Sequence, residues 1–422
     1  MLRISGLFYL HGFARSLPVA VPIGSVWASV IPQPCRIKLA GMFLLKKKVN
    51  MAGNIKLLII CCLFLMPLCG CYHSIAEKMV KAPNYGKTLD EVNGLRQLQF
   101  KKYQIDEHFK VEGSDAGIFL DVGVIEPKKQ WEIVPGSGWH DWLAQASRKH
   151  RIKMPEELYW EKCPDTAEQL YGFSFSSIPD EHTMWKQVRG TVICVHGLWM
   201  DKTVYAATWG QVFSVYGYRV ILVDLRGHGR STGDYITFGL KESADMAAVI
   251  DSLDDAGLLE GDLFLFGASL GASVAIETAA MDKRVDGVIA VSPFANIRDA
   301  APDFSRECFS FLSFLLGEKG INRVIDEAGE IAGFDPDADT VLDAVKKLEV
   351  PVLFIHGTAD MHVPCEHSVR LCRACRLGEL VMIEGKGHMN IGTEDMYLFR
   401  DMIIGWLEST GAMTMVQPDT SR

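Results

Sequence analysis

Short apolar runs alternate with amphipathic stretches along the chain from Gly190 onward. Apolar runs of this length are typical of strands that are buried on both faces, as in a parallel sheet. The stretches between them have the spacing of helices that bury one face. The predicted strands are Thr191–Val195, Arg219–Asp224, Leu263–Phe266, Gly287–Val291, Val352–His356 and Leu380–Ile383. The predicted helices lie near Thr203–Tyr216, Glu242–Ala256, Leu270–Ala280, Cys365–Cys375 and Glu394–Glu408. This alternation predicts an α/β fold with a mostly parallel, doubly wound sheet.

The segment from Pro293 to Val350 interrupts the alternation. It contains an apolar helix-like stretch, Phe309–Leu316, and a short acidic stretch, Asp335–Asp339. An insertion at this point, between the sixth and seventh strands, would lie above the carboxyl ends of the strands, where ligands bind in open α/β sheets. We predict a small helical cap at about residues 294–349 that shapes the substrate pocket.

The chain divides into several parts. We predict a catalytic domain over residues 188–410 and a C-terminal tail at 411–422. Residues 71–187 are expected to form a tether and an edge-strand and helical subdomain, because Ile118–Ile125 is a β-rich run that ends at a proline. The tryptophans between Trp131 and Glu161 are expected in a core, since no basic patch accompanies them.

Residues 1–70 contain the parts of an export signal. Lys46, Lys47 and Lys48 precede an apolar run, 57–68, that is too short to span a bilayer. The sequence Leu68-Cys69-Gly70-Cys71 resembles the bacterial lipobox. The resemblance implies a lipoprotein of the bacterial cell envelope, facing the periplasm or exterior, whose first mature residue, Cys71, anchors it in the membrane through acyl chains. A plain signal peptide or a signal anchor is the alternative.

This signal begins about 40 residues after Met1, whereas export signals normally start near the initiator. We hypothesise that translation begins at Met42 or Met51, so that residues 1–41 have no structural meaning. The intact mass or the N-terminal sequence of the native protein distinguishes these starts.

The charge is distributed unevenly. The chain has a formal net charge of −9, yet residues 1–70 contain eight Lys and Arg and no Asp or Glu. The remainder is therefore strongly acidic, which argues against nucleic-acid binding because that requires a basic face. Solubility is the simpler explanation of the acidity.

Cys372 and Cys375 have CxxC spacing, but no second CxxC and no nearby His pair joins them. On a helix, residues three apart are simply neighbours. We interpret them as incidental cysteines, with an extracytoplasmic disulfide among Cys365, Cys372 and Cys375 as the open alternative. No metal or organic cofactor is predicted, and the sequence does not indicate an oligomeric state.

Gly267-Ala268-Ser269-Leu270-Gly271 is the strongest chemical signal. It follows the buried run Leu263–Phe266 and precedes a helix, which is the context of a nucleophile elbow. A serine in so tight a turn has strained backbone angles, so Gly267 and Gly271 supply the small neighbours that it needs. The helix N-terminus then directs free N–H groups at developing negative charge. A dinucleotide-binding turn is disfavoured because GxGxxG is absent.

A serine hydroxyl needs a base to take its proton. His388 follows the last predicted strand and has glycines around it, and Asp360 follows the preceding strand. The chain order Ser, Asp, His is that of this kind of elbow. We predict a catalytic triad of Ser269, Asp360 and His388, with Glu384 as the alternative acid.

Two loops complete the pattern. His196-Gly197-Leu198-Trp199 resembles the HG turn of α/β hydrolases, and the loop from Asp224 to Ser231 resembles their D-x-R-G-H-G-x-S loop. The resemblance covers about residues 188–410 and suggests the branch of monoacylglycerol lipases, carboxylesterases and serine aminopeptidases. It implies an oxyanion hole formed by the N–H groups of Leu198 and Leu270. It also implies structural roles for His196 and for the cluster of Arg226, His228 and Arg230.

The sequence therefore predicts a serine esterase or lipase-like hydrolase that acts on a small-molecule acyl substrate by two-step acyl transfer. A serine peptidase for small peptides is the alternative, and its acidic site for a free amino terminus would come from cap residues. The candidates are Asp303, Glu307, Glu318 and Asp326. A surface lipoprotein that only binds a partner is the alternative from another class, disfavoured because catalytic geometry has no packing value of its own.

Overall fold

The computed structural model describes residues 71–94, 105–127, 188–206, 208–338, 340–391 and 396–414. The chain divides into two compact units, Met1–Lys78 and Met79–Arg422. Helix α4 (Cys71–Val80) crosses that boundary, and the predicted export signal before it lies outside the described residues. No helix within the described ranges is long and apolar enough to cross a bilayer. The following paragraphs concern the second unit by itself.

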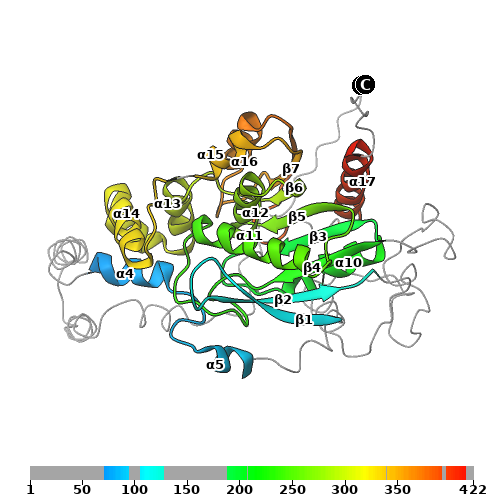
Figure 1. Ribbon diagram of the computed structural model, residues 1–422. Coiled ribbons are helices and arrows are strands. Elements are labelled where there is room, and N and C mark those ends of the chain that lie inside the picture. The colour runs from blue at the N-terminus through cyan, green and yellow to red at the C-terminus, as the bar shows by residue number, and fades with distance from the viewer. Residues whose placement is uncertain are drawn as a thin grey trace, which may run out of the picture. The chain divides into compact units, whose positions relative to one another are not determined.

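The second unit is built on one eight-stranded sheet (Figure 1). The strand order is β1-β2-β4-β3-β5-β6-β7-β8. Strands β3 to β8 are parallel, and β1 and β2 pair antiparallel at one edge. The strands are β1 (Glu107–Glu112), β2 (Phe119–Ile125), β3 (Gly190–Val195), β4 (Tyr218–Val223), β5 (Asp262–Ala268), β6 (Val285–Val291), β7 (Val352–Gly357) and β8 (Gly378–Ile383). The predicted mostly parallel sheet is confirmed.

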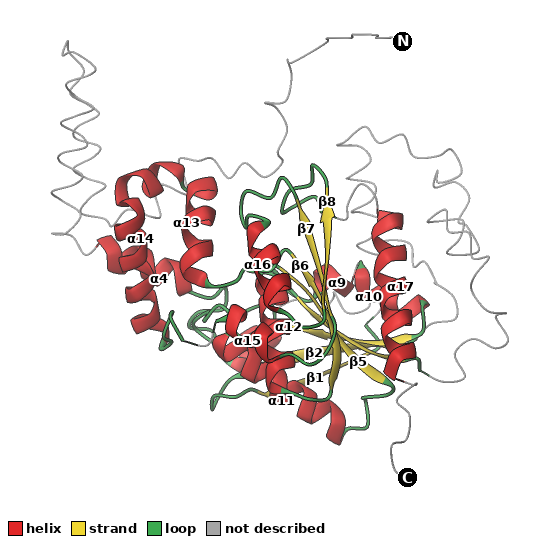
Figure 2. Ribbon diagram, turned by 90° about the horizontal axis from the view of Figure 1, so that it is seen from above, coloured by secondary structure: helices red, strands yellow, loops and turns green. Residues whose placement is uncertain are grey.

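Helices cover both faces of the sheet, because successive strand residues point to opposite sides. In β3, Ile193 and Val195 join one apolar core, and Val192 and Cys194 join the other. Helices α11 (Leu240–Asp255), α12 (Leu270–Met281), α15 (Val341–Lys347) and α16 (Glu366–Ala374) lie on the first face. Helices α9 (Thr203–Ala206), α10 (Trp209–Val215) and α17 (Met396–Thr414) lie on the second (Figure 2). Burial on both faces explains why the strands are nearly all apolar.

Strands β1 and β2 extend the main sheet instead of forming a sheet of their own. Strand β2 pairs with β4, with Val122 opposite Val223. The described part of the predicted 71–187 region thus supplies the sheet's edge and the short helix α5 (Leu89–Gly94). The tryptophan-rich segment from Trp131 to Glu161 lies outside the described residues.

Three helices lie between β6 and β7, where the cap was predicted. They are α13 (Ile297–Cys308), α14 (Ser310–Ala332), which is kinked at Gly317, and α15. Helix α15 packs its buried Val341 and Val345 into the sheet's first apolar core. It therefore belongs to the layer of helices on that face, which leaves α13 and α14 as the inserted pair.

Several predicted boundaries differ from the structure. The acidic stretch Asp335–Asp339 is a turn in its described part, because the Asp335 carboxylate accepts a hydrogen bond from the Asp337 N–H at 2.9 Å. The predicted helix Thr203–Tyr216 is two helices, α9 and α10. Helix α17 continues to Thr414, past the predicted domain end at residue 410.

Candidate active site

Ser269 lies in the turn between β5 and α12 with left-handed backbone angles, φ 55° and ψ −121°. Such angles are strained for a residue with a Cβ and are found mostly where function requires them. The turn is held by the Ser269 N–H, which donates to Val291 O of the neighbouring strand β6 at 2.8 Å. The serine is thereby fixed at the carboxyl edge of the sheet.

The two glycines of the elbow are required by close backbone contacts. A Cβ built on Gly267 would lie 2.3 Å from Gly271 O, and one on Gly271 would lie 2.0 Å from Val195 O. Both distances are far inside van der Waals contact, and in both cases the obstacle is backbone. Any larger residue would displace the turn that presents Ser269.

The HG turn lies against the nucleophile. A Cβ built on Gly197 would be 3.7 Å from Ser269 Cβ, so the turn after β3 contacts the turn after β5. Leu198 follows this glycine, and Leu270 is the first residue of α12. In the described part of the chain, neither the Leu198 N–H nor the Leu270 N–H is hydrogen-bonded. Two free donors beside the serine are what an oxyanion hole requires.

Two buried histidines support the HG turn. His196 Nε2 accepts a hydrogen bond from the Leu225 N–H at 3.0 Å, and His228 Nε2 accepts one from the Trp199 N–H at 3.3 Å. Burial, together with the neighbouring His228, lowers the pKa of His196 to about 3. Both imidazoles therefore act as neutral acceptors that fix the turn around Leu198.

A buried ion pair anchors the residues that follow the turn. Lys202 Nζ lies 2.6 Å from Asp224 Oδ2, and the side chains of both residues are almost fully buried. Asp224 also accepts the N–H groups of Lys202 and Arg230. Burial raises the pKa of Asp224, but the Lys202 ammonium and the hydrogen bonds from Lys202 outweigh it, so the pKa lies below its usual range. The pair ties the HG turn to the D-x-R-G-H-G-x-S loop.

The two arginines of that loop are also paired. Arg226 binds both oxygens of Asp245, at 2.6 and 2.7 Å, and Arg230 Nε lies 2.6 Å from Asp121 Oδ2. These contacts are internal to the protein, so the loop is a structural support and not a phosphate site.

Replacing Lys202 with methionine is expected to lower the free energy of unfolding by about 3–5 kcal/mol, because Asp224 would remain buried without its cation. Denaturant titration measures this change. Lys346→Met is the matched control, since Lys346 pairs with Asp343 at the surface and its loss should cost less than about 0.5 kcal/mol. Equal costs for the two variants would contradict the anchoring role.

Asp360 and His388 are brought together by the structure. His388 Nδ1 donates to Asp360 Oδ2 at 2.7 Å, and the Asp360 side chain is fully buried. Because a carboxylate only accepts, Nδ1 carries the proton and Nε2 is left with its lone pair. This is the tautomer that a general base needs. Between Ser269 and His388 themselves, the described residues contain no hydrogen bond.

The loop that carries His388 packs on the loop that carries Asp360. The Ala359 N–H donates to Lys386 O at 2.9 Å, and the Gly385 N–H donates to Thr358 Oγ1 at 2.9 Å. A Cβ on Gly357 would lie 2.1 Å from Lys386 O, so glycine is needed at that crossing. Glu384, the alternative acid, is exposed in this loop and is not the partner of His388 Nδ1.

Asp360 has a further partner that the sequence did not indicate. His356 Nε2 lies 3.3 Å from the same Oδ2 that His388 binds. The N–H groups of His362 and Val363 donate to Oδ1 at 3.0 and 2.9 Å. Burial raises the pKa of Asp360, but hydrogen bonds from His356 and His388 outweigh it and hold the pKa well below its usual range. The carboxyl group is therefore ionised at neutral pH.

Aromatic rings connect the HG turn to the His388 loop. Phe304 of α13 lies 6.2 Å from Trp199 and 6.0 Å from His362 between ring centroids, and His362 stacks on His388 at 5.5 Å. Residues beside the predicted catalytic groups are large, apolar and exposed: Trp199 by 53%, Met361 by 66% and Met389 by 67%. The surroundings of the site are thus mostly apolar.

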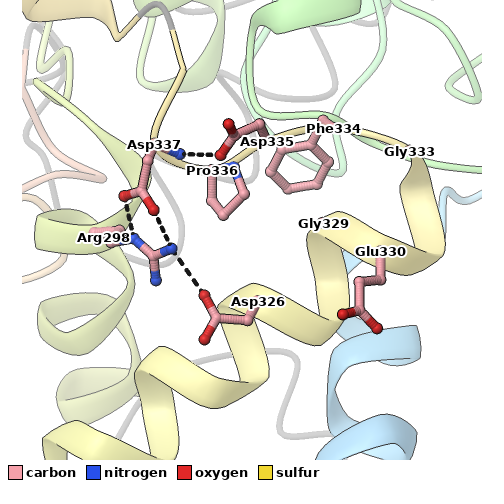
Figure 3. A pocket seen from close by; sticks show the side chains of 9 residues that line it. All are labelled: Arg298, Asp326, Gly329, Glu330, Gly333, Phe334, Asp335, Pro336 and Asp337. Carbon is pink, nitrogen blue, oxygen red and sulfur yellow. Dashed lines mark hydrogen bonds and ion pairs between the residues drawn. The ribbon is translucent and has the colours of Figure 1, made fainter.

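A pocket of about 510 Å³ lies elsewhere, between α13 and the C-terminal end of α14 (Figure 3). Arg298 points toward Asp326 and Asp337 there and pairs with both. None of the predicted triad residues lines this pocket. Among the described residues, no group of three or more His, Cys, Asp and Glu is arranged to hold a metal ion. Cys365, Cys372 and Cys375 are free thiols, which disfavours the disulfide alternative.

The sheet order, the elbow after β5, the acid after β7 and the histidine after β8 define the α/β-hydrolase fold. A sequence model described as the α/β hydrolase family matches residues 192–396, in agreement with this fold.

Two proteins similar in sequence and one solved structure similar in fold illustrate the likeness. The chain is 25% identical over 258 residues to the uncharacterized protein YqkD of Bacillus subtilis. This match covers 60% of this chain and 82% of that protein. It is 25% identical over 213 residues to α/β-hydrolase domain-containing protein 17B of Homo sapiens. This match covers 50% of this chain and 64% of the human protein. The chain therefore spans less than two thirds of the human protein. The structure of the Pyrococcus furiosus esterase Pf2001 is similar in fold, with a TM-score of 0.50 and 17% identity over 75% of this chain and 96% of that one.

Proposed function

We propose that this chain is a serine hydrolase that cleaves a carboxylic ester or a related acyl bond. Ser269 is the nucleophile, His388 the general base and Asp360 the acid that orients it. The observation that carries the proposal is the 2.7 Å hydrogen bond between His388 Nδ1 and Asp360, in loops at the same strand edge as the strained Ser269.

The proposed reaction has two steps. His388 Nε2 takes the hydroxyl proton while Ser269 Oγ attacks the carbonyl carbon, and the N–H groups of Leu198 and Leu270 hold the oxyanion. Protonated His388, whose charge Asp360 stabilises, then gives the proton to the leaving oxygen, and the acyl group stays on Ser269. Water hydrolyses the acyl-enzyme by the same proton transfers and restores the serine.

The apolar surroundings favour an ester of an apolar acid over a peptide. Trp199, Phe304, Met361 and Met389 offer aromatic and thioether surface on which an acyl chain gains by leaving water. A small-peptide peptidase needs a free carboxylate for the substrate's amino terminus. Of the four cap candidates, Asp326 is occupied by Arg298 and Asp303 is paired with Arg306, while Glu307 and Glu318 are exposed at the surface.

A purely binding role is the second candidate class. It leaves the strain at Ser269 without a purpose, because a left-handed turn at a serine costs about 1–3 kcal/mol and persists only where its surroundings impose it. The hydrolase proposal explains that cost, since the turn presents the hydroxyl beside two free N–H groups.

Labelling with a fluorophosphonate probe tests the proposal. We expect wild-type protein to become labelled on Ser269, as shown by peptide mass, and to hydrolyse chromogenic esters faster than aminoacyl anilides. A rate that rises with acyl chain length would agree with the apolar surroundings. Folded protein that neither reacts with the probe nor turns over any ester would refute the hydrolase proposal.

We also propose, from the sequence resemblance alone, that Cys71 is the lipidated first residue of a bacterial envelope lipoprotein. The intact mass of the native protein tests this proposal independently of activity, because lipidation and cleavage both change it.

A further inference from the structure

His356 is a buried histidine that the catalytic mechanism does not use. It lies near the end of β7, four residues before Asp360, and is 0% exposed. Its Nε2 lies 2.8 Å from Val363 O and 3.3 Å from Asp360 Oδ2, and its Nδ1 lies 2.6 Å from Ser368 Oγ. Both ring nitrogens are therefore engaged within the protein.

The partners fix the position of its proton. Val363 O and the Asp360 carboxylate can only accept hydrogen bonds, so Nε2 must carry a hydrogen. In the neutral imidazole Nδ1 then has a lone pair, and Ser368 donates its hydroxyl hydrogen to it. Ser368 is completely buried on α16. The serine thus sets the tautomer in which Nε2–H donates to Val363 O and lies close to Asp360 Oδ2.

We propose that His356 is a positioning residue for the Asp360–His388 pair, and that Ser368 holds it in the tautomer that performs this role. The inference rests on the proposed function. Oδ1 of Asp360 is fixed by the N–H groups of His362 and Val363, and Oδ2 is shared by two imidazoles. His356, through this contact and its hydrogen bond to Val363 O, thereby helps to fix the rotation of the carboxylate that orients the base.

This role differs from simple packing. A packing residue would affect stability alone. His356 Nε2 donates to Val363 O, whose residue binds Oδ1 through its N–H, and lies 3.3 Å from Oδ2, so it also affects the direction in which the carboxylate faces His388. The contact is also consistent with the depressed pKa of Asp360, because an N–H group near Oδ2 stabilises the ionised form.

Four variants test the proposal in the full-length protein: His356→Leu, His356→Gln, Ser368→Ala and Thr278→Val. Leucine fills the space without a donor, and glutamine keeps an N–H group near the position of Nε2. Thr278 is the matched control, because its buried hydroxyl bonds only within α12, to Val274 O. The readouts are the melting temperature, kcat and KM on a chromogenic ester, and the low-field proton signal of His388 Nδ1–H in NMR.

For His356→Leu we expect kcat to fall about 10–100-fold, the range found when a hydrogen-bond partner of a metal-ligating histidine is lost. KM should change by less than about twofold, because no substrate contact is removed. The low-field signal should shift or broaden. His356→Gln should regain most of the lost kcat, and Ser368→Ala should fall between the two. Thr278→Val should lose stability without a change in the signal.

Two results would overturn the proposal. One is a folded His356→Leu protein with an unchanged signal and kcat within about threefold of wild type. The other is equal loss in the leucine and glutamine variants, which would indicate shape alone. If His356→Leu does not fold, Ser368→Ala decides, because it leaves the imidazole in place. If wild type proves inactive, the hydrolase proposal fails, while the NMR signal still tests His356.

Discussion

Ser269→Ala is expected to lower kcat by about 10⁵–10⁶-fold, because the reaction loses both the atom that attacks the carbonyl and the covalent intermediate. Its stability should change little. The Ser269 side chain makes no capping hydrogen bond, and alanine has the same strain as serine at a φ of 55°. Progress curves on the best ester and thermal melts measure the two quantities.

Ser292→Ala is the matched control. Ser292 also follows a strand, β6, and also has a positive φ, 49°. Its buried hydroxyl has no hydrogen-bond partner within the described ranges, so its removal leaves no group unpaired. We expect this variant to keep activity within about threefold of wild type. If Ser269→Ala retained substantial turnover while folded, the nucleophile would have to be another residue.

The fold was predictable because its signal is local and repeated. Each run such as Leu263–Phe266 is apolar on both faces, which only a sheet covered on both sides accommodates, and the alternation with helices predicts parallel order. The joining of β1 and β2 to the far side of β4 was not predictable. It depends on pairings between residues about 100 positions apart, such as Val122 and Val223, that no local pattern encodes.

The inserted helices show a different limit. Helix α13 was missed because its sequence is polar and contains Pro302 in its interior. The Asn296 side chain, which accepts from the Asp299 N–H, is the capping signal that marks its start. Helix α14 was predicted only over its apolar first turns, since Gly317 interrupts the pattern there. Helix propensity did not predict either helix in full, because tertiary contacts override the intrinsic preference of the sequence at these points.

The predicted site residues stand out because their roles depend on a turn. Gly267 and Gly271 are needed by backbone contacts within the elbow, and this need is visible as a motif. His356 gave no such signal, because a histidine at the end of an apolar run resembles any strand terminus. One clue was available: a titratable residue in a strand buried on both faces needs a partner. Its hydrogen-bond partners are Ser368 Oγ and Val363 O, and Asp360, four residues later, lies 3.3 Å from Nε2.

Asp360→Asn is the second variant with a large expected effect. The Asp360 oxygen Oδ1 accepts two backbone N–H groups, from His362 and Val363, so the oxygen of an asparagine would remain there. Its NH₂ group would then occupy the position of Oδ2 and face His388 Nδ1. An amide donor forces Nδ1 to accept, which moves the imidazole proton to Nε2.

A histidine with its proton on Nε2 cannot take the proton of Ser269, so we expect kcat to fall about 10⁴-fold, as when the triad acid of a serine protease is changed to its amide. Glu384→Gln is the matched control, because it makes the same chemical change at an exposed carboxylate four residues before His388. It should leave kcat within about twofold. A loss only in Glu384→Gln would assign the orienting role to Glu384. Comparable losses in both variants would contradict the assignment of this role to Asp360 alone. A full loss in Asp360→Asn alone, with KM unchanged, would mean that the carboxylate acts through the tautomer of His388 and not through substrate binding.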